Sequence, residues 1–465
     1  MRSTVFGSDE TIGVAEGRGR RGHWSAGTYG GAARFTCVPV GTGAAAGKIR
    51  TVVWRRIPHA ARIRQTGWVL PMVMQGFPPP PDQRWRLEDW QTAPANTWSF
   101  IHLREVVPTA RVSRGTGPVR VLQHGPAAPL DVGLERTDGS SASVRDVLSG
   151  TYTDGYLVLH DGRIAAEAYF AGMTPHHTHL LMSVSKSIVG CAVGILIDRG
   201  ALDPAQPIAR YVPDLRSSGY ADASLRDVLD MRSGVAFSEA YLDPDADVRL
   251  LEQVMGWAPR RQADLPTSIY DYLVRLKADR AHGGRFDYRS CETDVLGWVC
   301  ERATGRRMPD LLSDLLWSRL GAEQDADGAV DAAGAVLHDG GLATTLRDLG
   351  RFGQLLADNG HVAEEDVVPE WWLEDAYAGA SDSRGAFAAD PTTGWLPGGM
   401  YRNQFWVPFS DRHVLLCLGI HGQLVWVDRD RRIVVAKLSH WPYPQDLGML
   451  LDTLRAIETL TDALA

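Results

Sequence analysis

The stretch Leu180-Leu-Met-Ser-Val-Ser-Lys-Ser187 opens a long apolar run that ends before Gly200. Glycine commonly follows the last residue of a helix, so we expect a helix over residues 183–199. Side chains three residues apart share one helix face, which brings Ser183 and Lys186 together at its start. A lysine amine in this position can activate a serine hydroxyl as a nucleophile without a histidine.

Lysine is scarce in this chain, which draws attention to Lys186. Only four of the 48 basic residues are lysines. Arginine keeps its proton in proteins, whereas a lysine can lose it when its amine is desolvated. The apolar residues around Lys186 favour desolvation, so we expect a lowered pKa and a neutral amine that takes the proton of Ser183. The motif alone leaves an alternative open, which is a surface serine beside a lysine that extends into solvent.

A second candidate motif is Tyr288-Arg289-Ser290, which precedes another expected helix over residues 293–304. A Tyr-x-Ser or Tyr-x-Asn motif after Ser-x-x-Lys is the second element of serine acyl enzymes, and Tyr288 can then pass a proton to the leaving group. Taken alone, the motif is short, and a structural tyrosine is the alternative.

Other hydrolase and metal motifs are missing from the sequence. No Gly-x-Ser-x-Gly or His-Glu-x-x-His motif occurs. The histidines at 176, 177 and 179 are spaced as in a loop rather than a metal site. A Gly-x-Gly-x-x-Gly match at 17–22 has no convincing strand before it. We therefore expect neither a metal nor a cofactor.

The remaining pattern indicates one sheet built from both ends of the chain. Apolar runs at 155–160 and 163–170 flank Asp161-Gly162, which is typical of a hairpin with a type I′ turn. Strand patterns return at 413–419, 423–428 and 432–438, and a last helix is expected over 446–463. The part between about 200 and 365 is mostly helical. We therefore expect an α+β fold, with an antiparallel sheet flanked by helices and a mostly helical second lobe.

The N-terminal part differs from the rest in charge and composition. The formal net charge is −8, yet residues 1–75 carry +8 and the remainder carries −16. We expect residues 1–76 to be a basic, Gly-rich extension that is disordered or spurious, and residues 77–465 to be the folded domain. The acidic remainder gives no indication of nucleic-acid binding. The five cysteines have no paired spacing, and the sequence shows neither a membrane span nor a signal-peptide core, so we expect a cytoplasmic protein.

Four stretches together resemble the serine β-lactamase-like superfamily, in its class C β-lactamase and esterase branch. They are LLMSVSKS at 180–187, DYRS at 287–290, GGLATTLRDL at 340–349 and GIHGQ at 419–423. Within it, the chain is most similar to the nylon-oligomer amidases of the 6-aminohexanoate-dimer hydrolase type, over roughly residues 85–465. The resemblance implies a β-lactamase and penicillin-binding-protein-like fold. It also implies a cofactor-free serine hydrolase that cleaves small linear amides or esters through an acyl-enzyme.

The resemblance also implies a set of site residues. Ser183, Lys186 and Tyr288 match the nucleophile, its base and the proton-relay tyrosine. The main-chain N–H groups of Ser183 and Ile420 match the oxyanion hole, and Tyr241 matches a tyrosine that contacts the amide. A further match, Trp406, corresponds to a pocket aromatic that contacts substrate. For partners, we expect a small amide or ester substrate and a homodimer.

One departure from the family concerns β-lactams. No Lys-Thr-Gly occurs anywhere in the chain, and the aligned strand reads Cys417-Leu-Gly419. In β-lactamases that lysine and threonine bind the β-lactam carboxylate, so their absence argues against β-lactam hydrolysis.

An acidic stretch after Tyr241 suggests that a carboxylate recognises a substrate ammonium group. Among its carboxylates we choose Glu252, because it lies on an expected helical turn, residues 248–255, that could fold over the cleft. The alternative is that these are solvated loop charges. Three other functions stay open at this point: a carboxylesterase, a D-Ala-D-Ala peptidase-like enzyme, and a non-catalytic binding module on the same fold.

Overall fold

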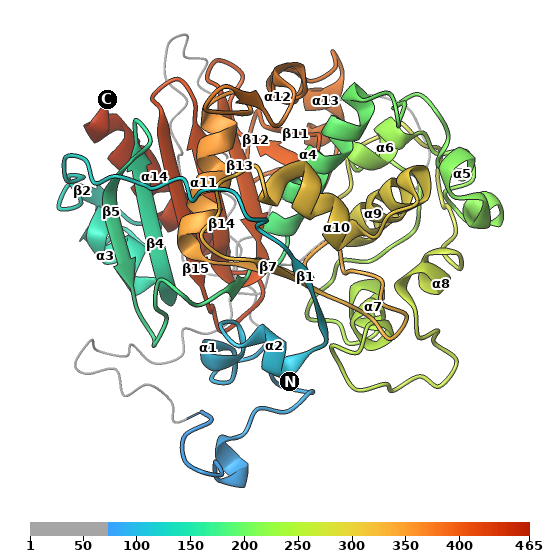
Figure 1. The fold of residues 1–465 in the computed structure, drawn as a ribbon, viewed down its shortest axis with the longest axis horizontal. Helices are drawn as coiled ribbons and strands as arrows, with labels where there is room; N and C mark the ends of the chain where they lie inside the picture. Colours follow the sequence, from blue (N-terminus) through green and yellow to red (C-terminus); the bar gives the residue numbers. More distant parts are fainter. Residues whose placement is uncertain (1–72) are drawn as a thin grey trace, which may run out of the picture. The chain divides into compact units, whose positions relative to one another are not determined.

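The computed structural model describes residues 73–465, and its largest sheet has seven strands in the order β11-β12-β13-β14-β15-β4-β5 (Figure 1). Every neighbouring pair in this sheet is antiparallel. The strands are β4 (Thr153–His160), β5 (Arg163–Tyr169), β11 (Met400–Arg402), β12 (Phe405–Val407), β13 (Val414–Gly419), β14 (Gln423–Asp428) and β15 (Ile433–Ser439).

Within this sheet β4, from the first half of the chain, pairs with β15 near the C-terminus, and Val158 lies opposite Val435. The expectation of one sheet assembled from both ends of the chain is therefore confirmed. The β4–β5 hairpin turns at Asp161 and Gly162, which both have positive φ, 50° and 71°. That conformation is the one that a type I′ turn requires, as the Asp-Gly pair indicated.

Helices cover both faces of the seven-stranded sheet. Neighbouring residues of a strand point to opposite faces of the sheet. On one face, Val434 contacts helix α11 (Leu346–Ala357). On the other face, Val435 belongs to a hydrophobic core with α3 (Val144–Gly150) and α14 (Leu447–Leu464). Helix α11 packs so closely on the sheet at Gly353 that a Cβ there would lie 2.4 Å from Val434. These two layers bury β14 and β15 completely.

A mostly helical lobe lies between residues 200 and 320, and it is shorter than the expected 200–365 because two short strands, at 326–329 and 342–344, follow it. Its helices are α5 (Ile208–Tyr211), α6 (Leu225–Leu229), α7 (Asp247–Val254), α8 (Ile269–Leu273), α9 (Ser290–Thr304) and α10 (Met308–Leu312), with the short turns η2 (Pro213–Ser217) and η3 (Ser313–Trp317). Ser224 and Asp227 form a capping box at the start of α6. Helix α9 begins at Ser290, three residues before its expected start, because the Glu239 side chain accepts the Ser290 N–H.

A second, four-stranded sheet was not expected from the sequence. Its order is β1-β7-β8-β6, for β1 (Thr109–Val112), β7 (Ala326–Ala329), β8 (Leu342–Thr344) and β6 (His179–Leu180). Strands of two to four residues are too short to show a two-residue hydrophobic period, which is why the pattern missed them. This sheet matters for the site, since β6 leads directly into Ser183.

The remaining elements are short and lie at the margins of the two sheets. They are η1 (Pro81–Gln83), α1 (Asn96–Ser99), α2 (Leu103–Val106), β2 (Gly133–Glu135), β3 (Ser141–Ser143), β9 (His361–Val362), β10 (Glu365–Asp366), α12 (Glu370–Ala378), α13 (Ser383–Ala388), η4 (Pro391–Thr393) and η5 (Ile420–Gly422).

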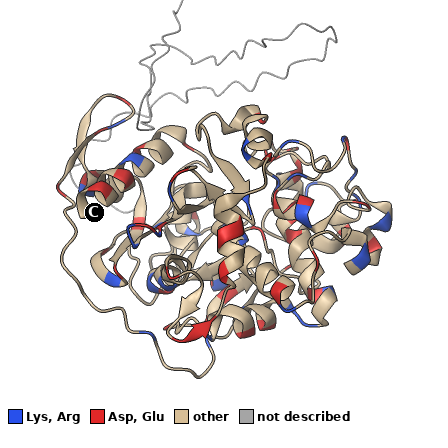
Figure 2. Ribbon diagram, turned by 90° about the horizontal axis from the view of Figure 1, so that it is seen from above, with Lys and Arg blue, Asp and Glu red and all other residues tan. Residues whose placement is uncertain are grey.

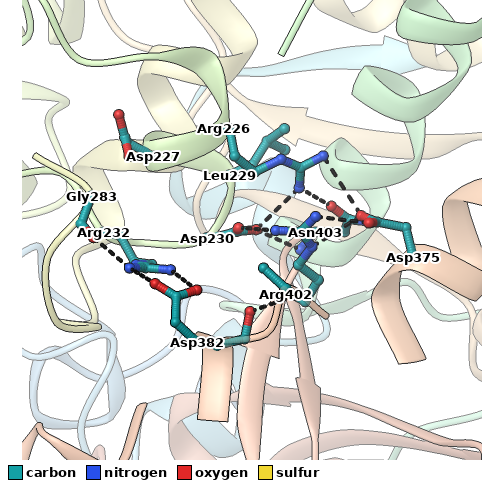
Figure 3. Close-up of polar contacts among 12 residues, drawn as sticks. Arg226, Asp227, Leu229, Asp230, Arg232, Gly283, Asp375, Asp382, Arg402 and Asn403 are labelled. Atoms are coloured by element: carbon teal, nitrogen blue, oxygen red, sulfur yellow. Dashed lines mark hydrogen bonds and ion pairs between the residues drawn. The ribbon is translucent and has the colours of Figure 1, made fainter. Parts of the chain in front are cut away.

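A buried ionic network ties the helical lobe to the end of the large sheet (Figure 3). Arg402 of β11 lies 2.6 Å from Asp230, which follows α6, and 2.7 Å from Asp375 of α12. Asn403 joins the same network by accepting from Arg226 and donating to Asp375, at 2.5 and 2.9 Å. Because every charge here has a close partner, the network holds the β11–β12 hairpin in one place.

The turn of that hairpin is conformationally strained. Asn403 and Gln404 both have positive φ, 53° and 69°, although neither is glycine. The turn packs against Gly190 of helix α4 (Val184–Asp198). A Cβ at this position would lie 2.6 Å from the Asn403 main-chain oxygen, so the close contact depends on glycine. The turn is therefore fixed between α4 and the ionic network, and it delivers β12 to the site.

Charges of both signs are spread over the fold, with basic and acidic segments interspersed along the helices and loops in view in Figure 2. Among residues 73–465, no helix combines the length and the apolar character that crossing a bilayer requires. The expected extension, residues 1–76, lies almost wholly outside the described residues. Packing is already present at Val73, which is buried, and at Met74, whose N–H donates to Gln83 at 2.7 Å.

Candidate active site

Ser183 and Lys186 meet at the start of α4, as the motif predicted. Ser183 is the residue that precedes the helix, and the Lys186 Nζ lies 2.9 Å from its Oγ. The chain reaches this position through Met182, whose φ is +47°, so a strained residue turns the end of β6 into the helix. Lys186 is only 1% exposed, which rules out the alternative of a lysine that extends into solvent.

The amine of Lys186 has two further acceptors besides Ser183. Ser290 Oγ lies 3.2 Å away and the main-chain oxygen of Asp339 lies 2.7 Å away. Three acceptors match the three N–H donors of an ammonium group. In addition, the Asp339 carboxylate lies 3.7 Å from Nζ.

The expectation of a lowered Lys186 pKa is wrong for the resting site. Burial does lower the pKa of Lys186, but the ionised form of Tyr288 and the carboxylates of Asp339, Glu239 and Asp294 raise it by more, so that it lies above the ordinary value. The sequence showed the apolar neighbours on the helix and not the carboxylates that distant loops bring in. Lys186 therefore carries a proton in the resting site.

Tyr288 completes the cluster. Its side chain hydrogen bonds to Ser183 and Lys186, and the Lys186 Nζ lies 5.3 Å from the centre of its ring. Burial raises the pKa of Tyr288, and the nearby ammonium group of Lys186 opposes this rise. A neutral phenol beside an ammonium group can donate a proton to a leaving group.

Trp406 is partly exposed and lies beside Tyr288. Neither ring is among the residues that line the cleft. The Trp406 ring stacks on that of Tyr288, with ring centres 5.4 Å apart and planes 23° apart, and it packs against Phe286 and Tyr401 as well. Direct contact with substrate stays a prediction, whereas these contacts support a role in holding Tyr288.

Ile420, the second expected oxyanion donor, follows a glycine that packs against the segment before Ser183. The preceding Gly419 ends β13 against the segment before Ser183, and a Cβ on it would lie 2.7 Å from the Leu181 main-chain oxygen. Only glycine allows this approach. Ser183 and Ile420 then both line the same cleft. No main-chain acceptor for the Ser183 N–H occurs among the described residues, so this donor is available to a ligand.

The cleft is small, with a free volume of about 40 Å³, and its lining is mostly apolar. Tyr241 and Glu252 both line it, as expected, and Glu252 lies on α7, close to the expected turn. The other lining residues are Gln91, Met182, Ser183, Val248, Leu251, Met255, Trp257, Ser290, Leu337, Asp339, Gly340 and Ile420. The cleft thus offers a long apolar wall, with polar groups near Ser183 and at Glu252.

Glu252 already has a cationic partner. Arg249, one turn earlier on α7, donates from one terminal nitrogen to both carboxylate oxygens, at 2.6 and 2.8 Å. Burial raises the pKa of Glu252, and Arg249 opposes the rise. The alternative of a solvated loop charge does not hold for this residue, because its side chain is 13% exposed.

Three carboxylates near Lys186 were missed by the sequence analysis. Asp339 touches the amine directly, and Glu239 accepts from the Ser290 N–H and from the Tyr241 hydroxyl. Asp294 is fully buried on α9 and accepts from the Asp339 N–H at 3.3 Å. Burial and the charge of Asp339 raise its pKa to about 7. These three carboxylates come from separate loops and a helix, so no local sequence spacing indicates that they surround Lys186. The one local hint is that Glu239 lies two residues before Tyr241.

Comparison with known proteins places this site in a family. The family model described as Beta-lactamase matches residues 149–459. The 6-aminohexanoate-dimer hydrolase of Paenarthrobacter ureafaciens is 40% identical over 384 residues, which cover 80% of this chain and 94% of that protein.

Solved structures agree with the sequence relatives. A protein from Bacillus anthracis assigned as a 6-aminohexanoate-dimer hydrolase superposes with a TM-score of 0.73 at 25% identity, over 80% of this chain and 95% of that one. A family VIII carboxylesterase shares the fold at a TM-score of 0.50 and 14% identity, over 73% and 99% of the two chains. The fold resemblance inferred from the motifs is therefore confirmed. The chain belongs to the beta-lactamase family and is a serine hydrolase.

Proposed function

We propose that this enzyme hydrolyses small linear amides of the kind named for its relatives, 6-aminohexanoate oligomers, and simple esters, through an acyl-enzyme on Ser183. The observation that carries the proposal is the contact of Ser183, Lys186 and Tyr288 at the end of an apolar cleft. A linear aliphatic chain can lie along such a wall and present its carbonyl to Ser183.

The proposed acylation follows from the positions of the donors. Neutral Lys186 accepts the proton of Ser183 while Oγ attacks the carbonyl carbon. The main-chain N–H groups of Ser183 and Ile420 stabilise the oxyanion that forms. When the carbon–nitrogen bond breaks, Tyr288 protonates the leaving amine and regains a proton from Lys186. Water then repeats the sequence on the acyl-enzyme and releases the acid.

This scheme requires Lys186 to lose its resting proton first. The carboxylates around it favour the protonated form, so only a fraction of the enzyme holds the neutral amine near pH 7. We therefore infer that kcat/KM rises with pH well above neutrality, until Lys186 is fully neutral or the fold is lost.

Two observations bear on the alternatives. All three proposed catalytic side chains are intact and in contact, which argues against a non-catalytic binding module. The missing Lys-Thr-Gly argues against β-lactams and against a D-Ala-D-Ala peptidase. Carboxylester hydrolysis uses the same site and remains part of the proposal. A homodimer and a cytoplasmic location stay predictions.

The test combines labelling with a substrate panel. A fluorophosphonate probe should add one label per chain by intact mass, and the Ser183→Ala variant should take none. The wild type should then cleave the linear 6-aminohexanoate dimer and p-nitrophenyl acetate but not the cephalosporin nitrocefin. Labelling with ester but no amide turnover would reassign the enzyme as a carboxylesterase. Labelling elsewhere than Ser183 would overturn the mechanism.

A further inference from the structure

Arg249 lies next to the cleft and contacts residues that line it, although it is not a lining residue itself. Its Nε donates to the Tyr241 main-chain oxygen at 2.7 Å, and its guanidinium lies 5.7 Å from the centre of the Tyr241 ring. From the same group, one terminal nitrogen reaches both oxygens of Glu252. A single arginine therefore contacts two of the residues that line the cleft.

Glu252 retains acceptor capacity while it is paired. A carboxylate can accept about four hydrogen bonds, and Arg249 provides one to each oxygen, while Gln91 provides another. The carboxylate lines the cleft, so a further donor can approach from the substrate side. Its charge, however, is already balanced by Arg249, and a pair with no net charge attracts a second cation weakly.

We propose that Arg249 is a specificity-determining residue, because its guanidinium acts as an internal counter-ion that competes with a substrate ammonium group for Glu252. This inference rests on the proposed hydrolysis of linear amides. In this arrangement the carbonyl of an ω-amino acyl chain lies at Ser183 and its ammonium end contacts Glu252. Wild-type enzyme then distinguishes poorly between an ω-ammonium chain and a neutral chain of equal length.

The Glu252 carboxyl has its own acid–base behaviour once Arg249 is removed. Burial and the charge of Asp339 raise the pKa of Glu252, and Arg249 is the group that lowers it most. Without Arg249 the carboxyl is easier to protonate, and a protonated carboxyl does not attract an ammonium group. The gain in preference should therefore grow from pH 6 to pH 9, where the substrate amine is still charged.

The experiment measures a ratio rather than one rate. The substrates are the p-nitroanilides of 6-aminohexanoic acid and of heptanoic acid, in which a methyl group replaces the ammonium group. Arg249→Gln should raise the ratio of their kcat/KM values, amino over methyl, by roughly tenfold at pH 9. Glu252→Gln leaves the Arg249 charge unpaired and should lower the ratio by about the same factor, and the double variant, which has neither charge, should return the ratio close to the wild-type value.

Two further variants separate this role from positioning of Tyr241. Arg249→Lys keeps a charge beside Glu252 but cannot bridge to the Tyr241 main chain as a fork, so it should leave the ratio close to wild type. Arg302→Gln removes an arginine paired with Asp214 at 2.5 Å, outside the residues that line the cleft, and should leave both rates unchanged.

An unchanged or lowered ratio in Arg249→Gln would overturn the inference. Equal losses on both substrates in the Gln and Lys variants would also overturn it, since they would assign Arg249 to positioning alone. Failure of the proposed function looks different, because the wild type would then label with fluorophosphonate but cleave neither anilide.

Discussion

The indole ring of Trp406 stacks on the ring of Tyr288, with centres 5.4 Å apart. We expect Trp406→Leu to lower kcat for ester and amide substrates by roughly tenfold to a hundredfold, because small shifts of a proton donor have large effects on rate. KM should change by less than kcat. The measurement is steady-state kinetics on both substrates.

The conservative Trp406→Phe variant should recover most of the rate, since it keeps a ring against Tyr288. Trp371→Leu, at a 42% exposed indole on α12, is the matched control for loss of a tryptophan. A rise in KM with unchanged kcat in Trp406→Leu would instead support the original expectation of direct substrate contact.

Ser183→Ala should lower kcat on the order of a thousandfold or more, as expected when one member of a cooperating catalytic set is removed. The alanine variant loses the acceptor 2.9 Å from Lys186 but stays folded, because the amine keeps Ser290 and Asp339 as partners. Circular dichroism checks the fold and stopped-time assays check the rate. Near-normal turnover would show that the nucleophile lies elsewhere.

Lys186→Arg should be as inactive as Lys186→Ala. Arginine keeps the charge that the surrounding carboxylates stabilise, but it cannot give up a proton at any accessible pH. Fluorophosphonate labelling rates across pH 6 to 10 provide the measurement. In the wild type the rate should climb with pH, and both variants should give flat, near-zero profiles. A pH-dependent rate in the arginine variant would remove Lys186 from the mechanism.

Asp294→Asn should stabilise the protein at alkaline pH. The pKa of Asp294 is raised from 3.8 to about 7, so the folded state binds a proton more tightly than the unfolded state. Stability is then highest with the carboxyl protonated, and it falls as pH rises between about 4 and 7. An asparagine resembles the protonated form, so we expect a gain in Tm on the order of a few degrees at pH 8 and none at pH 4.

Thermal denaturation at the two pH values provides the check on Asp294. Asp264→Asn, at an exposed loop position, serves as the control and should change neither Tm. A gain that is equal at pH 4 and pH 8 would mean that the effect is unrelated to ionisation.

A chain that starts at Met72 should keep its Tm and its kcat/KM on p-nitrophenyl acetate. It retains Val73, which is buried, and the hydrogen bond from Met74 to Gln83. We propose residues 77–465 as the hydrolase domain, with this short segment packed before it. The test compares the Tm and the kinetics of the full-length chain with those of the chain that starts at Met72. A large fall in Tm would show that the removed residues contribute to the fold.

The sequence predicted the parts of the fold that have long, regular patterns. The β4–β5 hairpin, strands β13, β14 and β15, and helix α4 were all expected within a few residues, whereas the short strands β11 and β12 were missed. The second sheet was missed because its strands are too short to show a period. Hydrophobic periodicity therefore located the elements that build the core, and it missed those that only connect it.

The same division holds in the site. Ser183, Lys186 and Tyr288 were found because each lies in a motif with fixed spacing. Asp339 and Asp294 approach Lys186 from residues far along the chain, so their effect on its pKa had no local signal. Arg249 was missed for a related reason, since its importance depends on the two side chains that it joins.

The pairing of β4 with β15 has a consequence for synthesis of the chain on the ribosome. Strand β4 emerges early, and its partner, near the C-terminus, follows only after most of the domain has been translated. At ~5–20 residues per second, the edge of β4 waits on the order of tens of seconds for its neighbour. Through that interval the nascent hairpin has an open edge that can pair with other chains. A chain that ends before residue 420 lacks both β15 and the proposed oxyanion donor Ile420, so we expect such partial chains to be inactive and prone to aggregate.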